Sequence, residues 1–96
     1  SYVDVDKPET WEAAIRPETK MFFIETPSNP SLDLIDIAWL SKLCKKHKIL
    51  LNVDNCFATP YLQTPAKLGA DLVTHSATKF IDGQGRVIAG CILGSK

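Results

Sequence analysis

Two short apolar runs with an amphipathic segment between them constrain the fold of this chain most strongly. The runs cover residues 21–24 and 49–51, and apolar stretches without polar alternation are typical of parallel strands that are covered on both faces. Between them, four apolar side chains and one histidine recur every three or four residues, which predicts a helix. These side chains are Ile37, Leu40, Leu43, Cys44 and His47, with Asp36 as the expected cap.

Strand, helix and strand at this spacing predict a βαβ unit with a right-handed crossover. The two strands are expected at residues 20–24 and 49–53, and Asp54 follows the second strand directly. The chain is therefore expected to be an α/β protein, with a mainly parallel sheet and flanking helices.

Further elements are expected on both sides of this unit. Residues 2–3 resemble the tail of a strand, and Asp6 is expected to cap a short helix that has Pro8 in its first turn and ends near Ile15. After the unit, residues 60–70 are rich in turn formers and end at Gly69. No internal repeat, low-complexity tract or linker interrupts this order.

Two more strands are expected near the carboxyl terminus. They cover residues 72–75 and 87–93, with a loop at residues 81–86 between them. The second strand contains Gly90, where close packing or a bend would favour glycine. His75 should point away from Ser76 if both lie on a strand, and we expect it to be a packed histidine.

Charge and hydropathy exclude several classes of protein. Eleven basic residues balance eleven acidic ones, so nothing favours a nucleic-acid partner, and a small lysine cluster is expected to be a solvated helix face. No apolar run approaches the roughly 20 residues that cross a bilayer, and no signal peptide opens the chain. These features favour a soluble, cytoplasmic protein without a membrane partner. The cluster consists of Lys42, Lys45, Lys46 and Lys48.

The three cysteines favour neither a disulfide framework nor a metal site. Their number is odd and no C-x-x-C pair is present, so zinc binding is not indicated. Cys44 falls on the apolar side of the expected helix and is predicted to be core. Cys56 falls in the loop after Asp54 and is expected to have a structural role.

The segment from His75 to Lys79 carries the strongest chemical signal. It places the amine of Lys79 behind the hydroxyls of Ser76 and Thr78, just past the end of an expected strand, and Asp54 ends the preceding strand. Open α/β sheets bind ligands at the carboxyl ends of their strands. An amine, two hydroxyls and a carboxylate suit pyridoxal 5'-phosphate (PLP), which has an aldehyde, a phosphate and a ring nitrogen. The alternatives are a solvated lysine and a turn aspartate.

Three separated motifs carry a resemblance to a known family. They are ETPSNP at residues 25–30, VDNCFATP at 53–60 and HSATKFIDGQGR at 75–86. In this order they resemble the large domain of the Cys/Met-metabolism family of PLP enzymes. That family includes cystathionine γ-synthase, cystathionine and methionine lyases, and homoserine-ester sulfhydrylases. The second and third motifs most resemble its O-succinylhomoserine sulfhydrylases.

The resemblance implies a role for each candidate residue. Lys79 would be the catalytic lysine, which bonds the aldehyde of the cofactor and then moves protons of the substrate. Asp54 would face the ring nitrogen, Ser76 and Thr78 would bind the phosphate, and Asn29 would touch the phenolic oxygen of the ring. Ordinary strand-end hydroxyls and an Asn-Pro turn remain the alternatives for the last three.

Three functions remain open at this point. The resemblance favours a PLP-dependent transferase of methionine and cysteine biosynthesis, which performs γ-replacement on O-succinyl- or O-acetylhomoserine with sulfide or a thiol. Elimination by a cystathionine β/γ-lyase or a methionine γ-lyase is the second possibility. A non-catalytic α/β fragment is the third.

The resemblance also implies that residues 1–96 are an internal fragment of a longer enzyme. Family members are several times longer, so the chain is expected to be part of a fold-type I PLP-dependent transferase large domain, without a second domain. The stacking tyrosine, the substrate-binding arginine, and the groups lent by a neighbouring subunit would lie outside it. The full protein is expected to be a homo-oligomer, a dimer or tetramer, and the isolated fragment is expected to be inactive.

Overall fold

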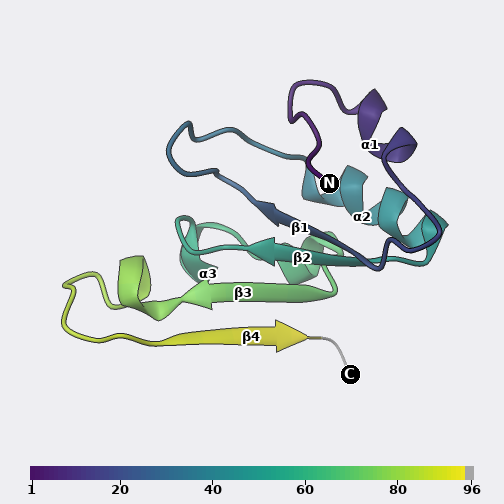
Figure 1. Ribbon diagram of the computed structural model, residues 1–96. Coiled ribbons are helices and arrows are strands. Elements are labelled where there is room, and N and C mark those ends of the chain that lie inside the picture. The colour runs from purple at the N-terminus through teal and green to yellow at the C-terminus, as the bar shows by residue number, and fades with distance from the viewer. Residues whose placement is uncertain (95–96) are drawn as a thin grey trace.

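The structure is a computed structural model that describes residues 1–94, and its centre is a four-stranded sheet in the order β1-β2-β3-β4 (Figure 1). The strands β1 (Met21–Glu25), β2 (Leu50–Asp54) and β3 (Leu72–Ser76) are parallel to one another. The last strand, β4 (Gly90–Gly94), runs antiparallel to β3. The expected mainly parallel α/β architecture is confirmed. The carboxyl ends of β1, β2 and β3 therefore lie at one edge of the sheet.

The helices are mostly short. The three α-helices are α1 (Glu9–Ala13), α2 (Ile37–His47) and α3 (Thr59–Leu62). A 3₁₀ turn (Pro65–Leu68) precedes β3, and a π-helical turn (Ala77–Ile81) follows it.

Helix α2 is the predicted crossover between β1 and β2, and its bounds match the sequence pattern. The Asp36 side chain accepts a hydrogen bond from the Trp39 backbone N–H at 2.9 Å, which confirms the cap. At the other end, Lys48 takes a left-handed conformation with φ 56° and closes the helix. Basic side chains in the last turn are favourable beside the helix carboxyl end.

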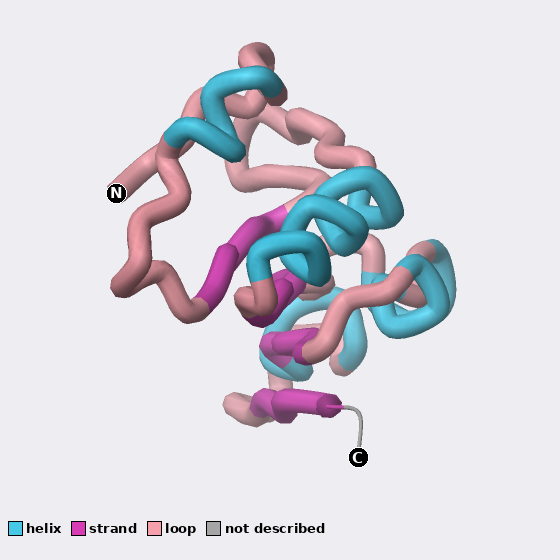
Figure 2. The backbone as a smooth tube through the Cα atoms, turned by 90° about the vertical axis from the view of Figure 1, so that its right-hand side faces the viewer, coloured by secondary structure: helices cyan, strands magenta, loops and turns pink. Residues whose placement is uncertain are grey.

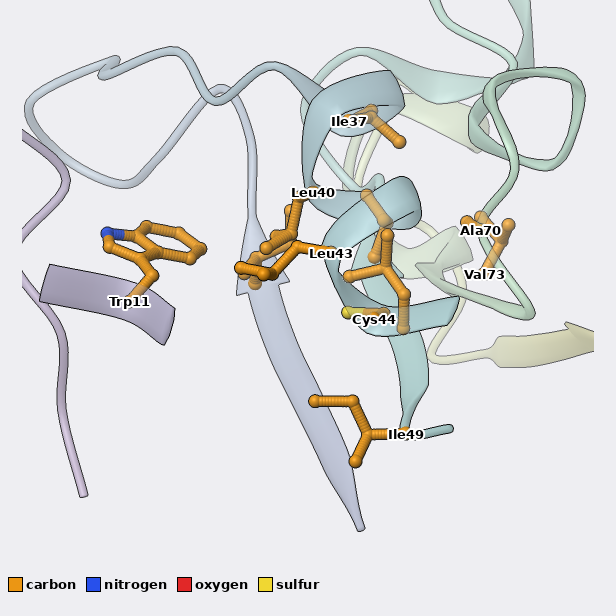
Figure 3. Close-up of a cluster of buried hydrophobic side chains, with 11 residues drawn as sticks. Trp11, Ile37, Leu40, Leu43, Cys44, Ile49, Ala70 and Val73 are labelled. Carbon is orange, nitrogen blue, oxygen red and sulfur yellow. The ribbon is translucent and has the colours of Figure 1, made fainter. Parts of the chain in front are cut away.

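The core lies between α2 and one face of the sheet (Figures 2 and 3). Cys44 is fully buried there, as predicted. Trp11 of α1 is buried at one side of the core. Its ring N–H donates a hydrogen bond to the Asp4 carbonyl at 2.7 Å. Burial of this apolar surface supplies the main free energy that holds the layers together. The core side chains are Trp11, Ile24, Ile37, Leu40, Leu43, Cys44, Ile49, Leu51, Val53, Ala70 and Val73.

The opposite face of the sheet is open within the described residues. Strand side chains alternate between the two faces, and on the face opposite the core β1, β2 and β4 each present exposed apolar side chains, while Asn52 of β2 is buried. The sequence pattern indicates strands that need cover on both faces, and residues 1–94 provide it on one. The exposed apolar side chains of this open face are Met21, Phe23, Leu50 and Ile92.

Two predictions at the amino terminus are wrong. Residues 2–3 form no strand, and α1 begins after Pro8 without a side-chain cap from Asp6. The reason is that Asp4 forms a turn instead, because its carboxylate accepts the Asp6 backbone N–H at 3.0 Å. The helix also ends at Ala13, two residues before the predicted end.

Near the carboxyl terminus, one strand boundary differs and two glycine predictions are confirmed. Strand β4 begins at Gly90, not at residue 87, because Thr78 occupies both backbone polar groups of Ala89. A Cβ at Gly90 would lie 2.9 Å from the His75 carbonyl oxygen, so the close approach requires glycine. Gly69 ends the 3₁₀ turn with φ 100°, which glycine tolerates.

Candidate active site

The sequence-predicted site residues lie at the carboxyl edge of the sheet (Figure 1). Asp54 ends β2, Ser76 ends β3, Asn29 lies in the loop after β1, and Lys79 lies in the turn after β3. Asp54 pairs in register with Glu25 on one side and with Thr74 on the other. The three strand ends are therefore adjacent, and the residues come from three successive loops.

Asp54 is half-buried and already makes one hydrogen bond. Its Oδ1 accepts the backbone N–H of Cys56 at 3.0 Å. This contact turns the chain directly after β2 and fixes the orientation of the carboxylate. Asp54 alternates with the core residue Val53, so its side chain lies on the open face of the sheet, together with Thr74.

Cys56 links the ends of two strands. Its Sγ accepts a hydrogen bond from the Ser76 backbone N–H, and its side chain is buried. Asn55, between Asp54 and Cys56, donates its backbone N–H to the Thr74 carbonyl at 2.9 Å. The loop after β2 therefore continues the contact with β3 beyond the sheet itself.

Lys79 lies within the π-helical turn, at a residue whose backbone is not helical. Its φ is −89° and its ψ is −117°. The side chain is exposed, and no residue in the range 1–94 forms a salt bridge with it. The next residue, Phe80, packs edge-on against Phe57 with 5.6 Å between ring centroids. Because Phe57 follows Cys56, this aromatic pair ties the lysine turn to the loop that contains Asp54.

The two hydroxyls differ in their contacts. Thr78 Oγ1 accepts the Ala89 N–H at 3.0 Å and lies 3.2 Å from the Ala89 carbonyl, to which it donates. A hydroxyl has one proton, so donation by Thr78 to a phosphate requires that proton to turn away from Ala89. Ser76 Oγ makes no hydrogen bond within the described residues and can donate without rearrangement.

Asn29 is held by its backbone, and its side chain is exposed. Its N–H donates to Glu25 Oε2 at 3.1 Å, and the Asn29–Pro30 peptide bond is cis. The same loop is held at its base by Thr26, whose Oγ1 accepts the Ile35 N–H at 3.0 Å. Asn29 therefore projects from a loop that is fixed at both ends.

A buried polar network joins two of these loops, and sequence reasoning did not find it. Gln63 Nε2 donates to the Thr26 carbonyl and to Asn55 Oδ1, both at 2.8 Å, and Asn55 Nδ2 donates to the Gln63 carbonyl at 2.9 Å. Thr26 and Asn55 are almost fully buried. Buried polar groups that are fully hydrogen-bonded make a structure rigid. The partners are distant in sequence, so no local pattern indicates them.

An apolar cavity of about 440 Å³ lies beside the aromatic pair. Its position places an apolar wall next to the lysine turn. The residues that line it are Pro27, Leu32, Phe57, Ala58, Leu62, Gln63 and Phe80.

His75 lies away from these groups, on the core side of β3. It is buried, and its Nδ1 has no hydrogen-bond partner. The prediction of a packed histidine is confirmed. Among residues 1–94, no group of three His, Cys, Asp or Glu side chains is arranged to hold a metal ion. Within the same range, no helix is both long enough and apolar enough to span a bilayer.

The donor set at this edge fits PLP. Within residues 1–94, it combines an exposed amine that forms no salt bridge, a half-buried carboxylate, a hydroxyl that makes no hydrogen bond and an exposed amide, all at the ends of β1, β2 and β3 or just after them. PLP offers an aldehyde that an amine can bond, a ring nitrogen that a carboxylate can face, and phosphate and ring oxygens that accept from a hydroxyl and an amide. Together with the open parallel sheet, these groups define a cofactor-binding α/β enzyme fold whose site lies at the carboxyl edge.

Comparison with known proteins gives the family. Residues 1–96 match the family described as Cys/Met metabolism PLP-dependent enzyme, and the chain belongs to that family. Its members depend on PLP, so the cofactor expected from the sequence is confirmed for the family.

The relatives are enzymes of sulfur amino acids. The chain is 60% identical over 84 residues to the O-succinylhomoserine sulfhydrylase of Pseudomonas aeruginosa, covering 88% of this chain and 21% of the relative. It is 45% identical over 95 residues to the L-methionine gamma-lyase of Pseudomonas putida, covering 99% and 24%.

A solved structure shows the same fold. The cystathionine gamma-lyase of Lactobacillus plantarum, complexed with L-serine, superimposes with a TM-score of 0.97 at 43% identity. The match covers all of this chain and 25% of that one. The chain thus spans about a quarter or less of the proteins that it matches, and its sheet is the corresponding part of their fold.

Proposed function

We propose that residues 1–96 form part of the PLP-binding large domain of a transferase that carries out γ-replacement on an O-acylated homoserine. In this reaction, sulfide or a thiol replaces the acyl carboxylate on Cγ of O-succinyl- or O-acetylhomoserine. The observation that carries the proposal is the joint placement of Asp54 at the end of β2, Ser76 at the end of the adjacent β3, and Lys79 in the turn that follows β3. The higher identity to the sulfhydrylase, 60% against 45% for the methionine lyase, favours replacement over elimination.

Each candidate residue of this chain has its own role in the proposed reaction. Bound PLP supplies a conjugated ring that accepts electrons from the amino-acid Cα. Lys79 would hold the cofactor before substrate arrives, and its freed amine would then take the Cα proton, remove a Cβ proton as the acyl carboxylate leaves Cγ, and return a proton to Cβ after sulfur has added to Cγ. Asp54 keeps the ring nitrogen protonated through its negative charge. Ser76 and Thr78 bind the phosphate. Asn29 orients the ring by a contact with the phenolic oxygen of the ring.

Elimination is the second candidate function. Two observations favour it: the methionine lyase matches 99% of this chain, and the cystathionine lyase structure superimposes over all of it. Both reactions begin with removal of the Cα proton, so Lys79 and Asp54 would have the same roles in either one. The branch depends on groups that bind the leaving group and the incoming sulfur.

We further propose that the rest of the protein and a neighbouring subunit complete the site in a homo-oligomer. The carboxyl edge described here contributes groups for the ring, the aldehyde and the phosphate. A substrate carboxylate needs a cationic partner, which the rest of the protein would contribute. A non-catalytic role would be favoured only if the full-length protein bound no cofactor.

The test uses the full-length protein and Lys79→Ala. We expect the wild type to show a visible absorption band with PLP, and borohydride reduction followed by mass spectrometry should place the pyridoxyl group on Lys79. The variant should lose the band and all turnover. Labelling of Lys67 instead would contradict the assignment.

The substrate is tested separately. The wild type is supplied with O-succinylhomoserine or O-acetylhomoserine and sulfide, and in parallel with methionine or cystathionine alone. Formation of homocysteine from the ester supports γ-replacement. Release of the keto acid from methionine or cystathionine, without activity on the esters, would establish elimination instead.

A further inference from the structure

Cys56 lies where the two halves of the candidate site meet. It is the second residue after Asp54, in the loop that follows β2, and 8% of its surface is exposed. A buried free cysteine usually behaves as a small apolar side chain. Here, however, its polar atoms contact residues on two different strands.

Cys56 makes one contact with the residue that ends β2 and one with the residue that ends β3. Its backbone N–H donates to Asp54 Oδ1 at 3.0 Å, and its Sγ accepts the backbone N–H of Ser76. Asp54 is the group proposed to face the ring nitrogen, and Ser76 is proposed to bind the phosphate. Cys56 therefore bridges the residues that would hold the two ends of the cofactor, through its backbone N–H on one side and its sulfur on the other.

The thiol is protonated at neutral pH. Burial, together with hydrogen bonding to the Asp54 carboxylate, raises the pKa of the Cys56 thiol to about 11. A protonated thiol can donate its S–H to Asp54 while its sulfur accepts the Ser76 N–H. A thiolate would repel the Asp54 carboxylate.

We propose that Cys56 is a positioning residue that fixes the distance and orientation between Asp54 and Ser76, and so prepares the site for PLP. This inference rests on the proposed function of the site. It assigns Cys56 no contact with substrate and no chemical step. A merely structural Cys56 would affect the folding of the protein and leave the affinity and the spectrum of the bound cofactor unchanged.

The test compares four variants of the full-length protein. Cys56→Ser keeps a donor and an acceptor, Cys56→Val keeps the bulk without either, and Cys56→Ala removes both. Cys44→Ala is the matched control, because Cys44 is also a buried cysteine but lies in the core. The readouts are the PLP dissociation constant, the pH midpoint of the visible absorption band, and the thermal unfolding midpoint of the cofactor-free protein.

We expect Cys56→Val and Cys56→Ala to weaken PLP binding roughly tenfold, because Ser76 N–H and Asp54 each lose a partner. The pH midpoint of the absorption band should shift, since the Asp54 carboxylate loses its hydrogen bond with the thiol and keeps only that with the backbone N–H of residue 56. Cys56→Ser should remain within about threefold of wild type. Cys44→Ala should lower the unfolding midpoint and leave both cofactor readouts unchanged.

Unchanged PLP affinity and pH midpoint in both Cys56→Val and Cys56→Ala would overturn the inference. Failure of Cys56→Ser to restore them would do the same, since its hydroxyl offers equivalent hydrogen bonds. If Cys56→Ala does not fold, Cys56→Val decides the question. A wild type and a Cys44→Ala variant that both bind no PLP would instead refute the proposed function, and the positioning role with it.

Discussion

Asp54 takes its place from the strand that it ends and from the turn that follows. The change Asp54→Asn keeps the shape of the side chain and removes the negative charge that is proposed to keep the ring nitrogen protonated. We expect removal of the substrate Cα proton to slow on the order of 100-fold or more, while PLP still attaches through Lys79. Exchange of the α-proton with deuterated solvent measures this step. Near-normal exchange in the variant would refute the role.

Changing Ser76 or Thr78 to alanine in the full-length protein should have different effects on PLP binding and on stability. Ser76→Ala should weaken PLP binding roughly tenfold to a hundredfold, because a hydrogen bond to a charged group contributes about 1.5–3 kcal/mol. Thr78→Ala should weaken binding and also lower the thermal midpoint, because Thr78 holds the backbone of Ala89. Dissociation constants and unfolding curves distinguish the two effects. A stability loss from Ser76→Ala equal to that from Thr78→Ala would contradict this division.

At this scale, the sequence located the chemical groups and missed their internal partners. Asp54 could be placed because it comes at the end of an apolar run, and Lys79 because it comes just after the strand expected at residues 72–75; strand ends are local features. The Ala89 contacts of Thr78 and the contacts made by Gln63 could not be predicted, because they join residues that are separated along the chain. The roles of all five residues in binding or catalysis remain predictions: Asn29, Asp54, Ser76, Thr78 and Lys79.

Among the elements, α2 depends on its cap. Removing the cap with Asp36→Ala should cost about 1 kcal/mol, because the Trp39 N–H loses its acceptor. Asp6→Ala is the matched control, since α1 has no side-chain cap, and it should change stability by less than about 0.5 kcal/mol. Denaturant unfolding of both variants of the full-length protein measures the difference. Equal losses would show that the Asp36 contact contributes nothing.

The predictability of the elements follows from how local their signals are. The bounds of α2 were predictable because a cap, a periodic apolar face and a closing turn all lie within the segment. The π-helical turn at Ala77–Ile81 was not, because neither its hydrogen bonds nor the backbone of Lys79 has a local sequence signature. The strand tail that was expected at residues 2–3 is absent. It was predicted from Tyr2 and Val3 alone, and the strand propensity of two residues is too weak to replace the turn that Asp4 forms.

For the molecule as a whole, the open face of the sheet is the dominant feature. Exposed apolar side chains promote association, and Phe23 and Ile92 are 61% and 67% exposed on this face. We expect the separated 96-residue chain to associate and to be inactive, as the sequence predicted. Sedimentation should show species larger than a monomer.

A matched pair of substitutions tests the cause of this association. Phe23→Thr with Ile92→Thr should reduce it, because threonine keeps strand propensity without the large apolar surface. Tyr61→Thr, which removes an exposed aromatic side chain outside the sheet, should leave it unchanged. A stable, well-protected and catalytically active monomer of the unmodified chain would contradict the prediction.

The three-loop construction of the carboxyl edge couples binding to folding. A ligand held by Asn29, Asp54 and Lys79 finds all three only when β1, β2 and β3 are paired, so it binds the native state and ignores the unfolded one. Linkage then requires that the ligand stabilise the entire sheet, by about 2.7 kcal/mol at a free concentration 100 times its dissociation constant. Occupancy of this edge and integrity of the sheet are thus thermodynamically coupled, and a bound cofactor reinforces the backbone pairing that already joins β1, β2 and β3.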